Sequence, residues 1–318
     1  MEEDAPARTR KPILLIALGG NALIRNGQKG TIAEQFANLR EPARQIAKLS
    51  ESYRIIITHG NGPQVGNLLL QQECCSAVPQ LPLEMLVAQT EGQIGYMIES
   101  TLDEALMERG IDYRPLVTLI TYVVVDQDDP SFKHPTKPIG PAYTEEIAAT
   151  LPYPTVKTHK GYRRVVASPK PVTIVEKKEI SHLIDSDFIV VCCGGGGIPV
   201  VRQGRAFAGV NAVIDKDLAS ALLACEVDAD VLVITTDVPG VMLHYGTPRE
   251  ELIGSMSVSE ALDYLEAGHF ASGSMRPKVE AAVQFVQHTK KRAAITALET
   301  IEAAVEAGAA TQVVLEKQ

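Results

Sequence analysis

The hydrophobic and polar positions of this 318-residue chain form two kinds of pattern, one typical of strands and one of helices. Short, nearly continuous apolar runs are typical of buried strands. They occur at residues 12–18, 53–58, 116–125, 188–193, 231–235, 293–296 and 312–315. Apolar residues that recur every three or four positions predict helices at 31–50, 83–108, 215–225, 258–267, 275–288 and 301–307. This alternation of strand and helix predicts an α/β protein with a parallel sheet.

Two of these helices have features that bear on packing. Pro42 lies inside the helix predicted at 31–50, so we expect a kink there or a division into two helices. The helix at 83–108 has enough apolar surface to cover the sheet or to pair with a second subunit. The sequence leaves both interpretations open.

Residues 126–171 interrupt the alternating pattern. They contain eight of the chain's 19 prolines, and the runs at 165–166 and 172–175 are typical of short hairpin strands. We therefore expect a flap or lid at about residues 126–175 that protrudes from the main sheet. Residues 1–11 are acidic at the start and lack an apolar segment, which predicts a flexible arm and no leader sequence.

The composition narrows the functional classes. A net charge of −9 argues against nucleic acid as a partner, because phosphate backbones require a basic surface. No apolar run approaches the roughly 18 residues of a membrane-spanning helix, so we expect no membrane partner. The five cysteines, among them the pairs Cys74-Cys75 and Cys192-Cys193, have neither disulfide nor zinc-site spacing. Reduced thiols in the cytoplasm fit best.

Glycine clusters follow three of the predicted strands. The clusters are Gly19-Gly20-Asn21, Gly60-Asn61-Gly62 and Gly194-Gly195-Gly196-Gly197. Because glycine has no Cβ atom, it leaves the backbone amides accessible to a phosphorylated ligand. Each cluster by itself also fits an ordinary tight turn. Three clusters on one sheet predict a shared anion site.

Three lysines accompany these glycines. Lys137 lies in the proline-rich flap, whereas Lys216 and Lys278 lie at the starts of predicted helices. An ammonium group and a helix N-terminus both attract anions. Each lysine alone fits a solvated surface residue, but together with the glycines they predict stabilisation of a phosphoryl group during transfer. We interpret Asp217 as the residue that orients the lysines, with helix capping as the alternative.

Several other catalytic motifs are absent from the sequence. It contains no P-loop, no G-x-G-x-x-G after the first strand, no protein-kinase signature and no G-x-S-x-G element. The histidines show no spacing typical of metal ligands, so we expect no catalytic metal bound by the protein itself.

Six motifs, in order, resemble those of the carbamate kinases of the amino-acid-kinase superfamily. They are ALGGNAL at 17–23, THGNGPQVG at 58–66, PTKPIGP at 135–141, GGGGIPV at 194–200, VIDKDLA at 213–219 and GSMRPK at 273–278. The resemblance runs from about Lys11 to the C-terminus. It implies the amino-acid-kinase fold, a three-layer αβα sandwich around a mainly parallel open sheet with a small protruding subdomain.

The same resemblance implies an activity. Carbamate kinases transfer a phosphoryl group reversibly between MgATP and carbamate, giving ADP and carbamoyl phosphate, and in arginine fermentation they make ATP. The resemblance also implies a homodimer, with Mg²⁺ bound through the nucleotide phosphates. Residues 12–185 would form an N-terminal lobe on the carbamate side, flap included, and residues 186–318 a C-terminal lobe on the nucleotide side.

The resemblance further implies roles for individual residues. Lys137, Lys216 and Lys278 would neutralise charge, and Asp217 would organise the lysines. The residues implied for the carbamate and the transferring phosphoryl group are Gly19, Gly20, Asn21, Gly60 and Asn61. Those implied for the nucleotide are Gly194, Gly195, Gly196, Gly197, Thr235, Asp237, Val238, His244, Tyr245 and Met275.

Four residues depart from the family's pattern. Many relatives have a lysine before the first Gly-Gly pair, whereas Leu18 stands here, so Lys137 has to supply that charge from the flap. Asn211 replaces an expected acidic residue, and Cys192-Cys193 replace small residues before the four glycines.

Two other functions remain open at this point. One is an acyl-phosphate-forming kinase of the same fold that acts on the carboxylate of an amino acid. The other is a nucleotide-binding regulator without catalysis, against which the presence of all three lysines argues.

Overall fold

The computed structural model describes residues 10–316 apart from residues 26, 76, 159–160 and 272. Most of the arm predicted at residues 1–11 lies outside this range. In the described part of the chain, the main sheet has eight strands in the order β15-β17-β16-β12-β1-β2-β9-β3. They are β1 (Ile13–Leu18), β2 (Arg54–His59), β3 (Leu116–Thr118), β9 (Ile189–Val191), β12 (Val231–Thr236), β15 (Ser255–Ser257), β16 (Arg292–Ala297) and β17 (Thr311–Val314).

The pairing of these strands is mostly parallel. β16 and β17 pair antiparallel, and the other neighbours run parallel. The central strands β1, β2 and β12 are buried over their whole length, as expected for parallel strands that are covered on both faces. The prediction of an α/β protein with a mainly parallel sheet is therefore confirmed.

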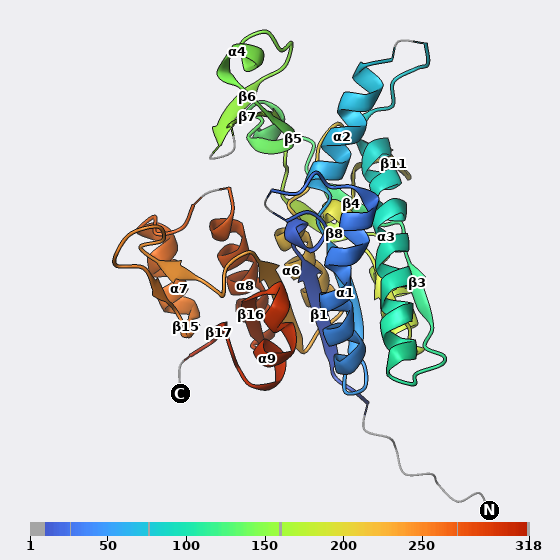
Figure 1. Cartoon of the computed structure of the whole chain (residues 1–318), viewed down its shortest axis with the longest axis vertical. Helices are drawn as coiled ribbons and strands as arrows, with labels where there is room; N and C mark the ends of the chain where they lie inside the picture. Colours follow the sequence, from blue (N-terminus) through green and yellow to red (C-terminus); the bar gives the residue numbers. More distant parts are fainter. Residues whose placement is uncertain (1–9, 26, 76, 159–160, 272, 317–318) are drawn as a thin grey trace, which may run out of the picture.

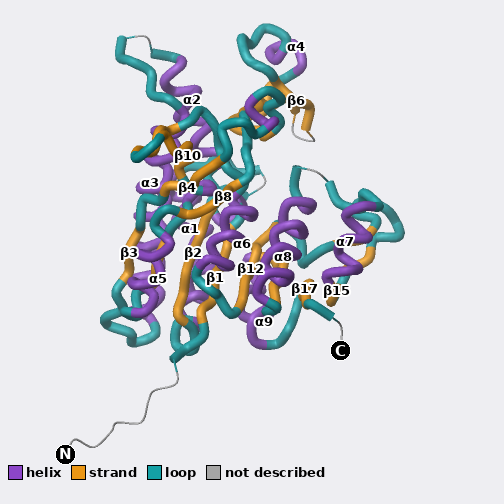
Figure 2. The backbone as a smooth tube through the Cα atoms, turned by 180° about the vertical axis from the view of Figure 1, so that it is seen from behind, coloured by secondary structure: helices purple, strands orange, loops and turns teal. Residues whose placement is uncertain are grey.

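Helices cover both faces of this sheet, and β1 shows the alternation that allows it. Leu14 and Ile16 pack into the core on one face, and Leu15 and Ala17 pack into the core on the other. The first face is covered by α1 (Ile32–Leu49), α3 (Leu83–Glu108) and α9 (Ile301–Glu306). The second is covered by α5 (Lys177–Asp185), α6 (Lys216–Glu226), α7 (Val258–Glu266) and α8 (Met275–Thr289). Figures 1 and 2 show these two faces from opposite sides, and the fold is a three-layer αβα sandwich.

The first long helix is not divided at its proline. α1 begins with a capping box, in which Thr31 and Glu34 satisfy each other's backbone N–H groups. It then continues through Pro42, which is itself buried. Pro42 faces a hydrophobic core together with Leu39, Ala43 and Ile46, so packing of this face holds the helix together despite the missing backbone donor.

One apolar run was predicted as a single strand and is instead two. Residues 116–118 form β3 in the main sheet, and Tyr122–Val125 form β4 in a second sheet with the order β11-β10-β4-β8. The partners of β4 are β8 (Pro171–Ile174), β10 (Ile198–Gln203) and β11 (Ala206–Gly209). The run at 172–175, predicted as a hairpin strand of the flap, therefore pairs with β4 in this sheet.

The chain between β4 and β8 forms a protruding unit, visible at the top of Figure 1. Its sheet has the antiparallel order β5-β7-β6, with β5 (Lys137–Tyr143), β6 (Thr155–Thr158), β7 (Gly161–Val166) and the short helix α4 (Glu145–Ala148). We use the word flap for this unit, residues 137–166. In the remainder, β13 (Met242–Leu243) pairs with β14 (Glu251–Leu252), and no described helix is long and apolar enough to cross a membrane.

A close backbone contact joins the flap to helix α2. α2 (Gly62–Glu73) packs against β5, and an added Cβ on Gly66 would lie 2.0 Å from the Cα atom of Gly140. Gly140 has a positive φ of 71°, so a side chain is disfavoured on that partner as well. The strand that carries Lys137 is thus held against α2 at a point where only glycine fits.

Replacement of Gly66 by alanine tests this contact. We expect Gly66→Ala to lower the free energy of unfolding by about 1–3 kcal/mol, because backbone has to move to make room for the methyl group. The measurement is the midpoint of thermal unfolding. Gly92→Ala is the matched control, since Gly92 is exposed on α3 with no atom within 4 Å of an added Cβ. Equal unfolding midpoints for the two variants would contradict the proposed close contact.

Candidate active site

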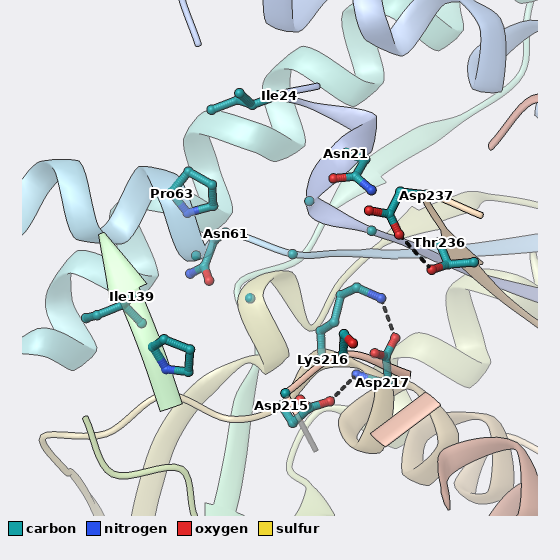
Figure 3. A pocket seen from close by; sticks show the side chains of 18 of the residues that line it. Asn21, Ile24, Asn61, Pro63, Ile139, Asp215, Lys216, Asp217, Thr236 and Asp237 are labelled. Carbon is teal, nitrogen blue, oxygen red and sulfur yellow. Dashed lines mark hydrogen bonds and ion pairs between the residues drawn. The ribbon is translucent and has the colours of Figure 1, made fainter. Parts of the chain in front are cut away.

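A cavity of about 790 Å³ lies at the carboxyl ends of the central strands, between the main sheet and the flap. The loops after β1, β2 and β12 all line it, because the carboxyl ends of parallel strands meet at one edge of a sheet. Figure 3 shows Asn61, Pro63 and Ile139 on one side of the cavity, with Thr236 and Asp237 on the other.

The first glycine cluster brings β1 close to β12. The backbone N–H of Gly19 donates to Oγ1 of Thr235 at 2.7 Å, and an added Cβ on Gly19 would lie 3.1 Å from the Thr235 carbonyl oxygen. Gly20 and Asn21 then line the cavity in a short 3₁₀ turn. An added Cβ on Gly20 would meet nothing within 4 Å, so its backbone is open to the cavity.

The second cluster positions a helix N-terminus. Gly60 lies against the side chain of Lys216, because an added Cβ on Gly60 would be 3.3 Å from the Cδ atom of Lys216. Asn61 is fixed by a hydrogen bond of 2.8 Å from its Nδ2 to Oγ1 of Thr90 on α3. Gly62 and Pro63 begin α2 and line the cavity, so the free N–H groups of this helix lie at the cavity wall.

The four consecutive glycines form a buried turn below the cavity. Only glycine fits here, because an added Cβ on Gly194 would meet the His59 ring at 2.5 Å and one on Gly195 would meet the Asn61 side chain at 2.1 Å. Gly196 and Gly197 are similarly close to Ile214 and Val123. Of the four, Gly195 lines the cavity. The structure places this turn beside Asn61, and its implied role toward nucleotide phosphates stays a prediction.

Two ammonium groups share one carboxylate at the base of the cavity. Lys216 forms an ion pair with Oδ1 of Asp217, and Lys278 forms one with Oδ2 at 2.9 Å. All three residues line the cavity, and the Asp217 side chain is only 6% exposed. Asp217 therefore contacts both lysines from α6 and α8, and it separates two like charges that would otherwise repel each other.

Burial and neighbouring charges both shift the pKa values of Asp217 and Lys216. Burial acts to raise the pKa of Asp217, but the charges of Lys216 and Lys278 outweigh it and hold this pKa below its ordinary value. Burial lowers the pKa of Lys216 to about 8, and the Lys278 charge adds to this effect while Asp217 opposes it. Near neutral pH Lys216 is charged, and it loses its proton more easily than an exposed lysine.

Asp215 has a role that the sequence analysis did not assign. Its Oδ1 caps α6 by accepting from the backbone N–H of Asp217 at 2.9 Å, and its Oδ2 accepts from Nζ of Lys137 at 2.5 Å. Asp215 is thus the helix cap, a role that had been weighed for Asp217. An aspartate just before a helix start is a strong capping signal in sequence, whereas its ion pair with a flap lysine has no local signal.

Only some of the residues after β12 and at the start of α8 that were predicted to bind the nucleotide line the cavity. Thr235 and Asp237 line the cavity, whereas Val238, His244, Tyr245 and Met275 are not among its lining residues. Tyr245 is 66% exposed, and the ring of His244 packs edge-to-face on His269 at 5.7 Å. The sequence analysis also missed cavity residues that carry no motif, among them Arg25, Gln28 and Arg163.

The sequence model of the amino acid kinase family matches residues 12–297. The chain belongs to the amino acid kinase family. As a member, the protein is a kinase that transfers a phosphoryl group.

Similar proteins within this family are carbamate kinases. The enzyme of Thermococcus kodakarensis is 46% identical, with 95% of this chain and 99% of that protein covered. Carbamate kinase 1 of Enterococcus faecium is 46% identical, with 91% of this chain and 94% of that protein covered. Among solved structures, carbamate kinase from Giardia lamblia bound to AMP-PNP has a TM-score of 0.87 and 39% identity, covering 96% of this chain and 98% of that one.

The structure shows where the residues lie that depart from the pattern of the family. Leu18 is buried at the end of β1, so no charge comes from that position. Lys137 reaches the cavity wall from β5, with its ammonium on Asp215. Cys192 and Cys193 are buried behind the glycine turn, and Asn211 is exposed.

The low pKa of Lys216 predicts that anion binding by this kinase depends on pH. We expect the affinity for sulfate, which carries the same charge from pH 6.5 to 9.5, to be greatest below about pH 8 and to fall as Lys216 loses its proton above it. Isothermal titration calorimetry across this range measures the effect. Asp217→Asn should move the fall to lower pH, because its carboxylate favours the charged form of Lys216. A pH-independent affinity in the wild type contradicts the expectation.

Proposed function

We propose that the protein is a carbamate kinase, which transfers a phosphoryl group reversibly between MgATP and carbamate to give ADP and carbamoyl phosphate. The proposal rests on the convergence of Lys137, Lys216 and Lys278 on one cavity. The carbamate kinases to which the chain is similar are covered over nearly their whole length. Three cations in one cavity suit a transferring group whose negative charge spreads over its oxygens.

The reaction needs no general base. In the direction of ATP formation, an oxygen of the ADP β-phosphate attacks the phosphorus of carbamoyl phosphate, and the bond from phosphorus to the carbamate oxygen breaks. Carbamate leaves with the electron pair of that bond, and no proton is transferred. Both nucleophiles, this phosphate oxygen and the carboxylate of carbamate in the reverse direction, are already anionic near neutral pH, so the side chains only have to position and neutralise charge.

Different parts of the cavity lining suit the two substrates. Gly19, Gly20, Asn21, Gly60 and Asn61 would surround carbamate and the transferring phosphoryl group, with backbone amides and the N-terminus of α2 as donors. Thr235 and Asp237, next to Gly19 at the end of β12, would lie beside the nucleotide. Val238, His244, Tyr245 and Met275 would extend that surface, and the turn of Gly194, Gly195, Gly196 and Gly197 would support the phosphates from below.

Magnesium would enter as part of the nucleotide substrate. Mg²⁺ often binds through substrate phosphates with one or two carboxylates and several waters. Within the described residues no group of three or more histidine, cysteine or acidic side chains is arranged to hold a metal. The phosphates would therefore supply its principal ligands.

The biological setting is also a proposal. We propose that the enzyme makes ATP from carbamoyl phosphate during arginine fermentation, and that it works in the cytoplasm as a homodimer. The cysteines are free thiols throughout the described chain, which fits a reducing compartment. Exposed apolar side chains on α3, among them Met85, Tyr96 and Met107, fit a subunit contact through this helix.

A coupled assay tests the choice of substrate. We expect ATP formation that depends on both ADP and carbamoyl phosphate, and no ADP release from ATP when acetylglutamate, glutamate or aspartate is the acceptor. Activity with one of these amino acids and none with carbamoyl phosphate would assign a different acyl-phosphate chemistry. Tight ADP binding without turnover on any of them would instead indicate a regulator.

Lys278→Ala tests the transfer chemistry. We expect kcat to fall about a hundredfold or more, because a cation that stabilises the transition state is lost. The fold should persist, since Asp217 keeps its ion pair with Lys216. Lys178→Ala is the control, because Lys178 is exposed on α5 and does not line the cavity. Thermal unfolding of both variants confirms folding, and a kcat of Lys278→Ala close to that of the control would contradict the role.

A further inference from the structure

The side chains of two adjacent arginines in the flap lie in different surroundings. Arg163 and Arg164 are neighbours on β7, and successive side chains of a strand face opposite sides. Arg163 lines the cavity, together with Lys137, Pro138 and Ile139 of β5. Arg164 instead lines the small gap between β5 and α2, away from the cavity.

Arg164 has its charge neutralised within the protein. Its Nη1 forms an ion pair with Oε1 of Glu73 at 2.5 Å, and its guanidinium lies 4.1 Å from the centre of the Tyr153 ring. These contacts join the flap to the end of α2. Arg164 is therefore a structural residue, with both its charge and its flat face already occupied.

Arg163 has no such counter-charge. Its Nε donates to the carbonyl oxygen of Gly140 at 2.9 Å, and within the described residues no carboxylate forms an ion pair with it. Burial lowers the pKa of this guanidinium, which nevertheless stays charged near neutral pH. Desolvation of a charge without an opposite partner is unfavourable.

The hydrogen bond to Gly140 also fixes the direction of the side chain. Gly140 lies at an irregularity of β5, where the register with β7 shifts between Ile139 and Tyr143. With Nε occupied, the two terminal nitrogens of Arg163 keep their donors in the planar fork that matches two oxygens of one anion. Lys137 begins the same strand, β5, so a guanidinium and an ammonium line the same part of the cavity wall.

We infer that Arg163 is a substrate-binding residue, which holds two oxygens of the small anionic substrate at the flap end of the cavity. Arg163 bonds to Gly140, and Ile139, the residue before Gly140, lies on the side of Asn61 and Pro63, opposite Thr236 and Asp237 (Figure 3). The inference rests on the proposed function for the name of that substrate, carbamoyl phosphate or carbamate. It adds a cation that selects for the substrate and is independent of the cations at the base of the cavity.

Steady-state kinetics of three variants test this inference. In the ATP-forming direction, Arg163→Gln should raise the KM for carbamoyl phosphate about tenfold or more, the loss expected for a charged hydrogen bond, and should leave the KM for ADP within about twofold of wild type. Arg163→Lys keeps the charge without the fork, so it should recover only part of the affinity. Arg164→Gln is the matched control: it removes a contact between the flap and α2, and it should not change the KM for carbamoyl phosphate relative to the KM for ADP. An unchanged KM for carbamoyl phosphate in Arg163→Gln would overturn the inference, as would an equal rise in the KM for ADP.

Inhibitors show which oxygens Arg163 holds. If it holds the phosphoryl group, inhibition by inorganic phosphate weakens in Arg163→Gln and inhibition by acetate does not. If it holds the carboxyl group of carbamate, acetate inhibition weakens instead. Both results support the inference, and unchanged inhibition by both anions contradicts it.

A binding measurement separates this inference from the proposed function. If the wild type forms no ATP from carbamoyl phosphate, the proposed function fails. Calorimetry with sulfate then still compares Arg163→Gln with Arg164→Gln. Weaker sulfate binding in Arg163→Gln alone supports an anion-binding Arg163, and equal affinities in the two variants refute it.

Discussion

The carboxylate of Asp217 holds the site together, because it lies between two ammonium groups that would otherwise repel each other. Two like charges a few ångströms apart in a buried site are strongly unfavourable without an opposite charge. Asp215 supplies the counter-charge of Lys137, and in addition it caps α6. The protein can therefore hold three cations around an open cavity before any substrate arrives. Because both carboxylates come from the start of α6, this one helix end connects the flap to α8.

The fold supplies the rest of the site through close backbone contacts. The loops that follow the parallel strands lie at one edge of the main sheet. Glycine allows these loops to approach each other more closely than other residues would. The buried glycine turn fits between His59, Asn61 and Ile214, and Gly66 lets the flap strand lie directly on α2. These contacts are stiff, so the positions of Lys137 and Asn61 depend on packing well away from the cavity.

The chemistry that this site supports relies on electrostatics. A phosphoryl group that passes between two anionic oxygens requires neither a proton acceptor nor a covalent intermediate on the protein. His59, whose pKa burial lowers to about 4, is neutral near pH 7 and lies under the glycine turn, where it acts as a packing residue. The charged side chains around the cavity are thus the three lysines, the aspartates Asp215, Asp217 and Asp237, and the arginines Arg25 and Arg163.

The sequence by itself determined most strands of the main sheet, most of the helices that cover it and the family motifs, because periodic burial and strand-end glycines are local patterns. It could not show that the apolar run at 116–125 passes from one sheet to another, since both halves are equally apolar. Nor could it pair Lys137 with Asp215, 78 positions away, or distinguish Arg163 from its neighbour Arg164. Those outcomes were decided by the tertiary structure, because the charge and burial around a side chain are set by segments that only folding brings together.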